Sequence, residues 1–302
     1  MRFRQGRFAF MADIENMFHQ VRVPSRDRDA MRFLRWQDGD LAIEPVPYRM
    51  NVHIFGAISS PCVCNYALKK TAEDNKDDFD TTTFDTVRKD FYVDDCLKSL
   101  DDEHDTIRTA KNVKTLLRKG RFNLTKFASN SRALLEAIPP EERAASLREL
   151  GSNDLPSERA LGCLWDMEND VFTFKVKLKP RPLTRRGLLS VTRSIYDPLG
   201  FVAPIMLPGK IIGQELCKLG LNWDDPIPLV YVDKWNAWLE DISLLEEIKI
   251  PRCLFPPGFG RVVNTQLHHF SDASEVGYGT VSYMRVENEL GEIHTALMTC
   301  KS

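Results

Sequence analysis

The sequence of 302 residues lacks the features of several protein classes. Its seven cysteines are odd in number and scattered, with no CxxC pair, so we expect neither a disulfide framework nor a zinc site. No apolar run is long enough to span a membrane, and no N-terminal stretch resembles a signal peptide. The formal net charge is only −2, which indicates no overall attraction to a polyanion, although a basic groove could exist locally. These absences favour a reduced, intracellular protein with no membrane partner.

The proportions of hydrophobic and charged residues are typical of a globular protein. The sequence is 43% hydrophobic and 28% charged, and its length suits two or three compact units. It opens directly into a strand-like pattern and stops at LMTCKS, close behind another strand-like run. We therefore expect a piece of a longer chain.

Hydrophobic periodicity and turn residues predict alternating strands and helices in the N-terminal half. Ser60 followed by Pro61 predicts a helix start, because serine can cap the exposed amides and proline suits the first helical position. The polar stretch 73–90 indicates an exposed loop or helix end. The other predicted elements are a strand at 7–14, a hairpin of 31–36 with 41–50, a hairpin at 91–100, and a helix at 105–119 ended by Gly120.

The C-terminal half carries a basic segment. VFTFKVKLK, residues 171–179, alternates apolar residues with lysines and predicts a strand. From Val171 to Arg193 there are seven basic residues and no acidic one, which suits either a nucleic-acid backbone or a solvated charged face. The other expected elements are a helical stretch near 131–149, helices near 185–196 and 208–219, a helix carrying Trp235 and Trp238, a proline-rich linker at 251–257, and short strands at 267–274, 278–286 and 294–300.

The stretch FYVDDCLKSL, residues 91–100, places Asp94 and Asp95 inside an apolar run. Carboxylates near a buried strand are costly unless their charge is offset. A hairpin turn is one explanation, since aspartate is a common turn residue. A metal site is the other: Asp13 also ends an apolar strand, and three carboxylates at one sheet edge would suit Mg²⁺. Two such ions, roughly 3.5–4 Å apart, can clamp the attacking and leaving oxygens of a phosphoryl transfer.

Three motifs in order, ADIENMFHQVRVP, FGAISSP and FYVDD, resemble the palm motifs of reverse transcriptases. DIENMFHQVRVPSRDRDAMRFLRW is most similar to the BEL/Pao group of long-terminal-repeat retrotransposons, and LTKFASN, LGCLWD and SIYDPLGFVAPIMLPGK continue the likeness over nearly the whole chain. The resemblance implies an α+β fold. Its expected parts are a partial fingers and palm region at 1–170, a thumb- or connection-like segment at 171–257, and a truncated RNase H-like start at 262–302.

The resemblance also implies roles for individual residues. Asp13 and Asp94 match the metal-binding aspartates, and Asp95 matches their less directly bound partner. Phe18 matches the bulky gate that excludes a ribonucleotide 2′-hydroxyl, with core packing as the alternative. The remaining implied residues are Ile14, whose carbonyl would contact the metal; Gly56, Ser60 and Pro61 beneath the incoming nucleotide; Tyr92 beside the primer terminus; Lys126 near the leaving phosphate, or as a plain surface lysine; and Leu161 and Gly162 as a primer grip. Phe55 departs from the family, because it stands where many reverse transcriptases have glutamine.

The function implied by the resemblance is RNA-directed DNA polymerisation by nucleotidyl transfer to a primer 3′-hydroxyl. The expected cofactor is Mg²⁺, or Mn²⁺ in its place. The expected partners are deoxynucleoside triphosphates, an RNA or DNA template–primer, and other parts of a retroelement polyprotein. The expected location is cytoplasmic, within a virus-like particle in relatives. The alternative is a catalytically inactive remnant that acts at most as a nucleic-acid-binding or structural module.

Near the C-terminus, FSDASEVGYGTVSY resembles the first strands of a retroviral-type RNase H. Asp272 matches its first catalytic aspartate, but one carboxylate cannot build a two-metal site, so we expect no RNase H activity from this chain. In the family, the segment from about 185 onward is often labelled a Pao retrotransposon peptidase region. The sequence has neither Asp-Thr-Gly nor Asp-Ser-Gly, the signature of aspartic peptidases, so we expect no proteolysis.

Overall fold

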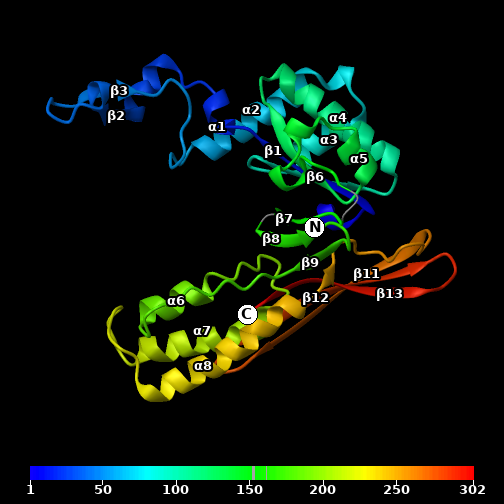
Figure 1. The fold of residues 1–302 in the computed structure, drawn as a ribbon. Coiled ribbons are helices and arrows are strands. Elements are labelled where there is room, and N and C mark those ends of the chain that lie inside the picture. The colour runs from blue at the N-terminus through cyan, green and yellow to red at the C-terminus, as the bar shows by residue number, and fades with distance from the viewer. Residues whose placement is uncertain (152–153, 161) are drawn as a thin grey trace. The chain divides into compact units, whose positions relative to one another are not determined.

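A computed structural model describes residues 1–151, 154–160 and 162–302 (Figure 1). The chain is a mixed α/β protein with several antiparallel sheets. It divides into two compact units. The first unit is Phe8–Gly151 with Arg2, and the second is Ser152–Ser302 with Met1 and Phe3–Arg7. The three-part division expected from the sequence stays a prediction. Within the described residues, every helix is too short or too polar to cross a bilayer.

The first unit is built on an antiparallel sheet of order β4-β5-β1-β6. Its central strand β1 (Phe8–Ile14) pairs with β5 (Asp95–Leu100) on one side and with β6 (Leu124–Ser129) on the other. The short β4 (Phe91–Tyr92) joins β5 as a hairpin. The predicted strand at 7–14 and hairpin at 91–100 are therefore confirmed, and they are neighbours.

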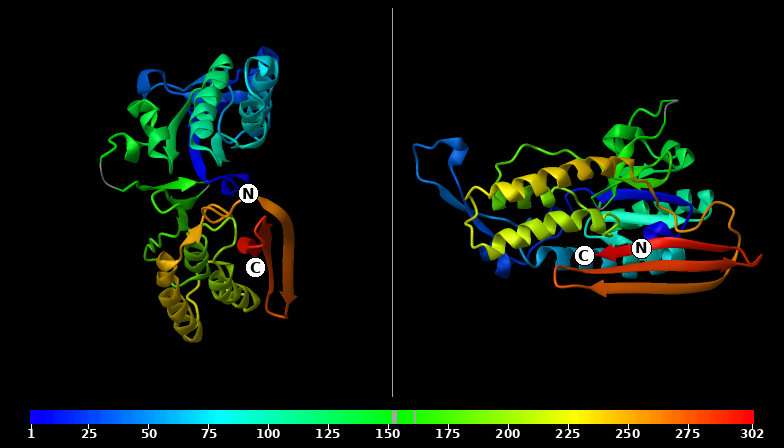
Figure 2. Two further views of the ribbon diagram at one scale, coloured as in Figure 1. Left: turned by 90° about the vertical axis from the view of Figure 1, so that its right-hand side faces the viewer. Right: turned by 90° about the horizontal axis from the view of Figure 1, so that it is seen from below.

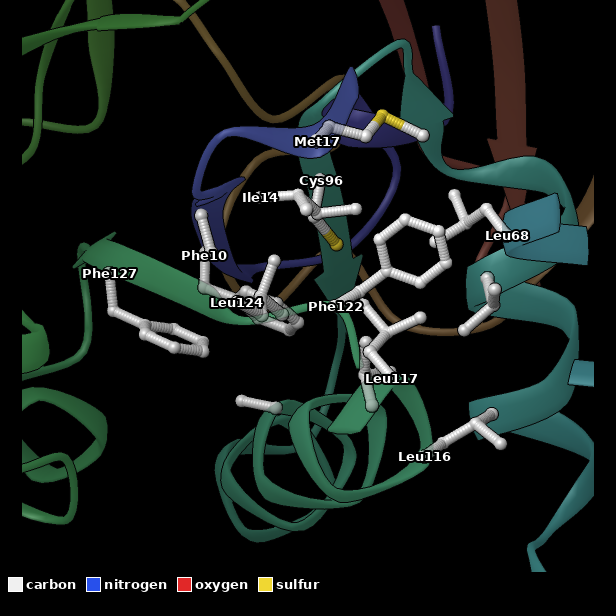
Figure 3. Close-up of a cluster of buried hydrophobic side chains, with 14 of the residues drawn as sticks. Phe10, Ile14, Met17, Leu68, Cys96, Leu116, Leu117, Phe122, Leu124 and Phe127 are labelled. Carbon is white, nitrogen blue, oxygen red and sulfur yellow. The ribbon is translucent and has the colours of Figure 1, made fainter. Parts of the chain in front are cut away.

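Helices cover this sheet because their apolar faces need a partner surface. In α4 (Glu103–Lys119), Ala110, Val113, Leu116 and Leu117 are fully buried, as the sequence periodicity predicted. The other helices of the unit are α1 (Met17–Gln20), α2 (Ser60–Asp74), α3 (Thr81–Lys89) and α5 (Arg132–Glu136). Figure 3 shows the resulting core, where side chains from β1, β5, β6, α2 and α4 meet around Phe10, Leu68, Leu117 and Phe122.

Three details of the first unit differ from the sequence predictions. Residues 73–90 are not a loop: α3 lies there because the Asp80 carboxylate accepts a hydrogen bond from the Thr83 amide and caps the helix. The predicted helix start at Ser60 is confirmed, but its hydroxyl caps nothing and instead bonds to His53 Nδ1 at 3.2 Å. The helical stretch near 131–149 shortens to α5, because Pro139 and Pro140 cannot donate the amides that a continuing helix needs.

A separate hairpin of β2 (Arg32–Arg35) and β3 (Val46–Arg49) confirms the predicted pairing, and all of its residues are exposed. Both figures show it extending away from the sheet and helices of its own unit (Figures 1 and 2).

Short 3₁₀ helices complete the chain at Arg2–Arg4, Ser25–Met31, Gln37–Gly39, Lys76–Asp78, Pro140–Glu142, Ala145–Leu147 and Leu244–Glu247.

In its described residues, the second unit contains two antiparallel sheets and three helices. The smaller sheet has the order β10-β9-β8-β7, and the larger has the order β11-β12-β13. The strands are β7 (Ser157–Ala160), β8 (Cys163–Asp166), β9 (Val171–Thr173), β10 (Ile250–Pro251), β11 (Val262–Ala273), β12 (Tyr278–Asn288) and β13 (Ile293–Lys301). The helices are α6 (Arg185–Thr192), α7 (Ala203–Lys218) and α8 (Leu229–Ser243). Most of these elements were predicted, but β9 stops at Thr173 and the lysine-rich residues after Phe174 form no ladder.

A buried arginine holds the second unit together. The Arg252 side chain is fully buried, and its guanidinium bonds to both Asp170 oxygens at 2.6 and 2.8 Å. It also donates to the carbonyls of Phe3, Gly6 and Arg7. A buried arginine is tolerated only when it is paired and its donors are satisfied, and here the N-terminal segment supplies the acceptors.

Candidate active site

The candidate site lies where β1 ends beside the β4–β5 hairpin. Asp13 on β1 and Asp95 on β5 are directly opposite each other in the antiparallel register. Cross-strand partners project to the same face of a sheet, and like charges placed opposite each other destabilise it. Two carboxylates at this position therefore need a compensating positive charge.

Asp94 occupies the tight turn that precedes Asp95. The turn has two residues, Val93 and Asp94, between the paired Tyr92 and Asp95. Val93 has φ of +56°, a left-handed conformation that costs a β-branched residue roughly 1–3 kcal/mol. The Asp94 carbonyl accepts a hydrogen bond from the Ile14 amide at 2.9 Å, which fixes the turn against the end of β1. The structure thus brings Asp13, Asp94 and Asp95 to one edge of the sheet.

Lys126 reaches the same edge from the other side of β1. The β1–β6 ladder has a register shift between Met11 and Asp13, which places one extra residue in β6. Lys126 lies in this bulge with φ of +55°. A bulge re-aims side chains out of the regular alternation. The Lys126 ammonium consequently donates a hydrogen bond to Asp13 Oδ1 at 3.0 Å, while the lysine side chain is 63% exposed.

The electrostatics of the site follow from burial and crowding. Burial, together with the neighbouring Asp94 and Asp13 charges, raises the pKa of Asp95 to about 6. Burial also raises the pKa of Asp94, and the Asp13 charge adds to this. The hydrogen bond to Asp13 raises the pKa of Lys126. The three carboxylates therefore hold more negative charge than the single ammonium balances.

The donor set fits a hard divalent cation, because it consists of carboxylate oxygens. The unrelieved repulsion around Asp95 is what a bound cation would remove. Among the described residues, however, no three His, Cys, Asp or Glu side chains are arranged so that they could hold a metal ion together. Lys126 holds one Asp13 oxygen instead.

Phe18 lies on α1, directly after the site strand. Its side chain is 7% exposed and belongs to the core of the first unit. The ring of Phe55, which is 64% exposed, meets it edge-on at a centroid distance of 4.8 Å. Phe18 therefore packs as a core residue, and its role as a nucleotide gate stays a prediction.

The predicted nucleotide loop leads from Phe55 into α2. Gly56 has φ of +87°, which favours glycine, and open space surrounds it. Ser60 is fully buried and Pro61 is exposed. His53, which bonds to Ser60, is 6% exposed and fixes the base of this loop, yet nothing in its sequence context singled it out.

Of the other predicted residues, Tyr92 lies at this edge, while Gly162 and Asp272 belong to the second unit. Tyr92 is 66% exposed on β4, beside the aspartate turn. Leu161 of the predicted primer grip lies outside the described residues. Gly162 has φ of +85° in the second unit, and a Cβ there would lie 2.2 Å from Tyr196 Cδ1. Asp272 is exposed on β11, opposite Gly279 of β12.

Comparison with known protein families gives a match in the C-terminal part of the chain. Residues 184–302 match the family model described as the Pao retrotransposon-like RNaseH-like domain. No curated protein matches the chain. The family match supports a Pao-type retrotransposon polyprotein region with an RNase H-like domain at its C-terminal end.

Proposed function

We propose that the chain is the polymerase part of a BEL/Pao-type retrotransposon polyprotein, an RNA-directed DNA polymerase that extends a primer by nucleotidyl transfer. One observation carries the proposal: Asp13 and Asp95 are cross-strand partners, with Asp94 in the turn beside them. Structural needs alone do not account for this crowding, because it costs stability. The family match of residues 184–302 supports the retrotransposon origin, and an RNase H-like domain implies nucleic-acid binding.

In this proposal the residues have separate tasks. Asp13 and Asp94 would hold Mg²⁺ or Mn²⁺, with the Ile14 carbonyl as a further contact. Two metal ions bound in this way would make the primer 3′-hydroxyl a better nucleophile and stabilise the leaving pyrophosphate. Lys126, released from Asp13 by the cation, would be free to contact the leaving phosphate. The strained Val93 turn holds the aspartate backbone in one place.

The substrates in this proposal are deoxynucleoside triphosphates and an RNA or DNA template–primer. Phe18 would exclude ribonucleotides, and Tyr92 would lie beside the primer terminus. Sequence choice would come from base pairing, while the protein contacts backbone and shape.

A second candidate is a non-catalytic retroelement region that binds nucleic acid or has a structural role. The ion pair between Lys126 and Asp13 favours it, because it neutralises a carboxylate that catalysis needs for a cation. The two candidates differ in whether a divalent cation displaces Lys126.

The test is Mg²⁺-dependent extension of oligo(dT) on a poly(rA) template. Asp94→Asn should abolish extension, and Asp77→Asn, at an exposed aspartate of the same unit, should leave it unchanged. Cooperative unfolding of all three proteins is checked first. A well-folded native chain that extends no primer would reject the polymerase and leave the second candidate.

A further inference from the structure

A cavity of about 990 Å³ lies in the second unit, between helices α6 and α7 and strands β12 and β13, which Figure 1 labels. Leu188 of α6 and Met206 of α7 form apolar walls and are themselves buried. None of the residues proposed for the polymerase site lines this cavity. Its volume is at the upper end of the range that small-ligand pockets occupy.

Large side chains at the cavity are unusually exposed. Leu189, Tyr196 and Trp223 line it with exposed fractions of 42%, 56% and 48%. The guanidinium carbons of Arg185 and Arg186 lie 4.7 and 5.9 Å from the centroid of the Trp223 ring, so two cations accompany this exposed aromatic side chain. Exposed aromatic and apolar side chains gathered around a hollow mark a binding site more often than a plain surface.

The strand side of the cavity is polar. Thr280, Ser282 and Thr299 contribute hydroxyl groups to its lining. The threonine hydroxyls donate to backbone carbonyls, of Phe270 and Leu199 respectively. A hydroxyl that donates one bond still has lone pairs that can accept another. The two threonine hydroxyls can therefore accept hydrogen bonds from the edge of a ligand, while the Ser282 hydroxyl is bonded to His269 Nδ1 at 2.7 Å.

Positive charge surrounds the cavity. Its lining includes Arg185, Arg193, Lys210 and Lys301, and among the described lining residues Asp197 is the one acidic side chain. The Asp197 carboxylate is already occupied, because it accepts hydrogen bonds from the amides of Phe201 and Val202. Within the described part of the chain, Arg193 and Lys301 form no ion pair. Arg185 and Lys210 already donate to the carbonyl oxygens of Leu221 and Ser302, so Arg193 and Lys301 are the cations that a bound anion would complement.

We propose that this cavity binds a nucleotide unit of single-stranded nucleic acid. The flat face of a base suits the Tyr196 and Trp223 rings, and its amino edge suits the hydroxyls on β12 and β13. The flanking phosphates would lie against Arg193 and Lys301. A neutral apolar ligand would leave these cations unused, and a base inside a duplex is stacked and cannot enter. The inference goes beyond the proposed polymerase site and does not depend on it.

The first experiment measures anisotropy of a fluorescein-labelled oligo(dT) bound to the whole chain in EDTA. Gly213 of α7 lines the cavity, and a Cβ added there meets nothing within 4 Å. Gly213→Phe should place a ring in part of the cavity and weaken binding at least tenfold. Gly213→Ala is the matched control. It removes the backbone freedom of glycine, as Gly213→Phe does, but adds only a methyl group, and it should bind within twofold of the native chain.

The second experiment tests the phosphate contact. Arg193→Gln should weaken oligo(dT) binding and reduce the slope of log K against log salt by about 0.7, the contribution of one phosphate on a single strand. Arg148→Gln removes the same charge from an exposed position in the first unit and should leave the slope unchanged.

Any one of four outcomes would overturn the proposal. The first is equal binding by Gly213→Phe and Gly213→Ala. The second is an Arg193→Gln slope equal to that of the native chain. The third is competition by duplex DNA as strong as that by the single strand. If the anionic dye anilinonaphthalene sulfonate binds in a Gly213→Phe-sensitive way while oligo(dT) does not bind, the cavity is a small-molecule site and the proposal is wrong. The assay contains no metal, primer or triphosphate, so a failed extension assay leaves this result standing.

Discussion

Lys126 donates a hydrogen bond to Asp13 across 3.0 Å, from a bulge in the neighbouring strand of the same sheet. The ammonium holds the position that a divalent cation would need on that carboxylate. In the proposed function the same contact stabilises the sheet before a cation binds and would compete with that cation. The competition can be measured without any assay of catalysis.

Lys126→Met should tighten Mn²⁺ binding to the nucleotide-free chain. Removing an exposed opposite-charge partner is worth up to about 1 kcal/mol, which corresponds to about a fivefold change in affinity. The measurement is titration with Mn²⁺, followed by the loss of its free electron-resonance signal. Lys119→Met removes a lysine that pairs with the surface Asp78 and should leave Mn²⁺ affinity unchanged. Weaker Mn²⁺ binding by Lys126→Met would mean that the lysine organises the site instead of competing for it.

The crowded carboxylates should make the metal-free chain less stable as pH rises. Because burial and the Asp94 and Asp13 charges raise the folded-state pKa of Asp95 to about 6, above the ordinary value of 3.8, the folded chain holds its proton more tightly. Stability is therefore lost between about pH 4 and pH 6 and stays low above that window. Asp95 is only half-buried, so solvent screening reduces the effect to about 1–2 kcal/mol.

Urea unfolding at pH 4 to 7 in EDTA measures this loss. Asp95→Asn should flatten the profile, and added Mg²⁺ should restore stability near pH 7 because it neutralises the same carboxylates. An Asp95→Asn profile with the native slope would show that other groups titrate in this range.

The sheet of the first unit was predictable because its signals are local. Apolar alternation marks β1, and apolar residues at helical spacing mark α4. The α3 helix was missed because the side chains that it buries include Thr83 and Thr86, which look polar in the sequence. Burial of these threonines depends on neighbours that a local pattern does not contain.

The candidate site was predictable only in part, for a similar reason. Aspartates inside apolar runs are conspicuous, so Asp13, Asp94 and Asp95 were expected to converge, and their roles stay predictions. The left-handed backbone of Val93 and Lys126 was not predictable, since neither residue type favours it. Burial of Arg252 was equally hidden: arginine is rarely buried, and its carboxylate partner Asp170 lies far away in the sequence.

Loss of the Arg252–Asp170 pair should unfold the second unit more readily than loss of a surface pair. Arg252→Met removes the cationic partner of the Asp170 carboxylate and the donor to the carbonyls of Phe3 and Gly6, which should cost about 3–5 kcal/mol. Urea unfolding followed by tryptophan fluorescence reports it, because the Trp165 indole donates to Asp170. Arg186→Met breaks the exposed pair with Asp224 and should cost less than about 1 kcal/mol. Equal costs for the two variants would show that burial adds nothing to this pair.

Phe18 supplies the test of substrate choice. Its ring is nearly buried against Phe55, so Phe18→Ala would leave a core cavity costing about 3–5 kcal/mol, and the milder Phe18→Val is the better variant. If the ring excludes a 2′-hydroxyl, Phe18→Val should raise UTP incorporation relative to dTTP at least tenfold on poly(rA). The measurement is the ratio of kcat/KM for the two nucleotides in primer extension.

Phe55→Leu is the matched control for this ratio. It removes the partner ring from the same contact but leaves Phe18 in place, so it should alter stability without changing the nucleotide preference. A Phe18→Val enzyme that keeps the native ratio would assign Phe18 to core packing alone. Equal changes from both variants would place the selectivity in the packing of the loop that carries Phe55, because either substitution loosens that loop.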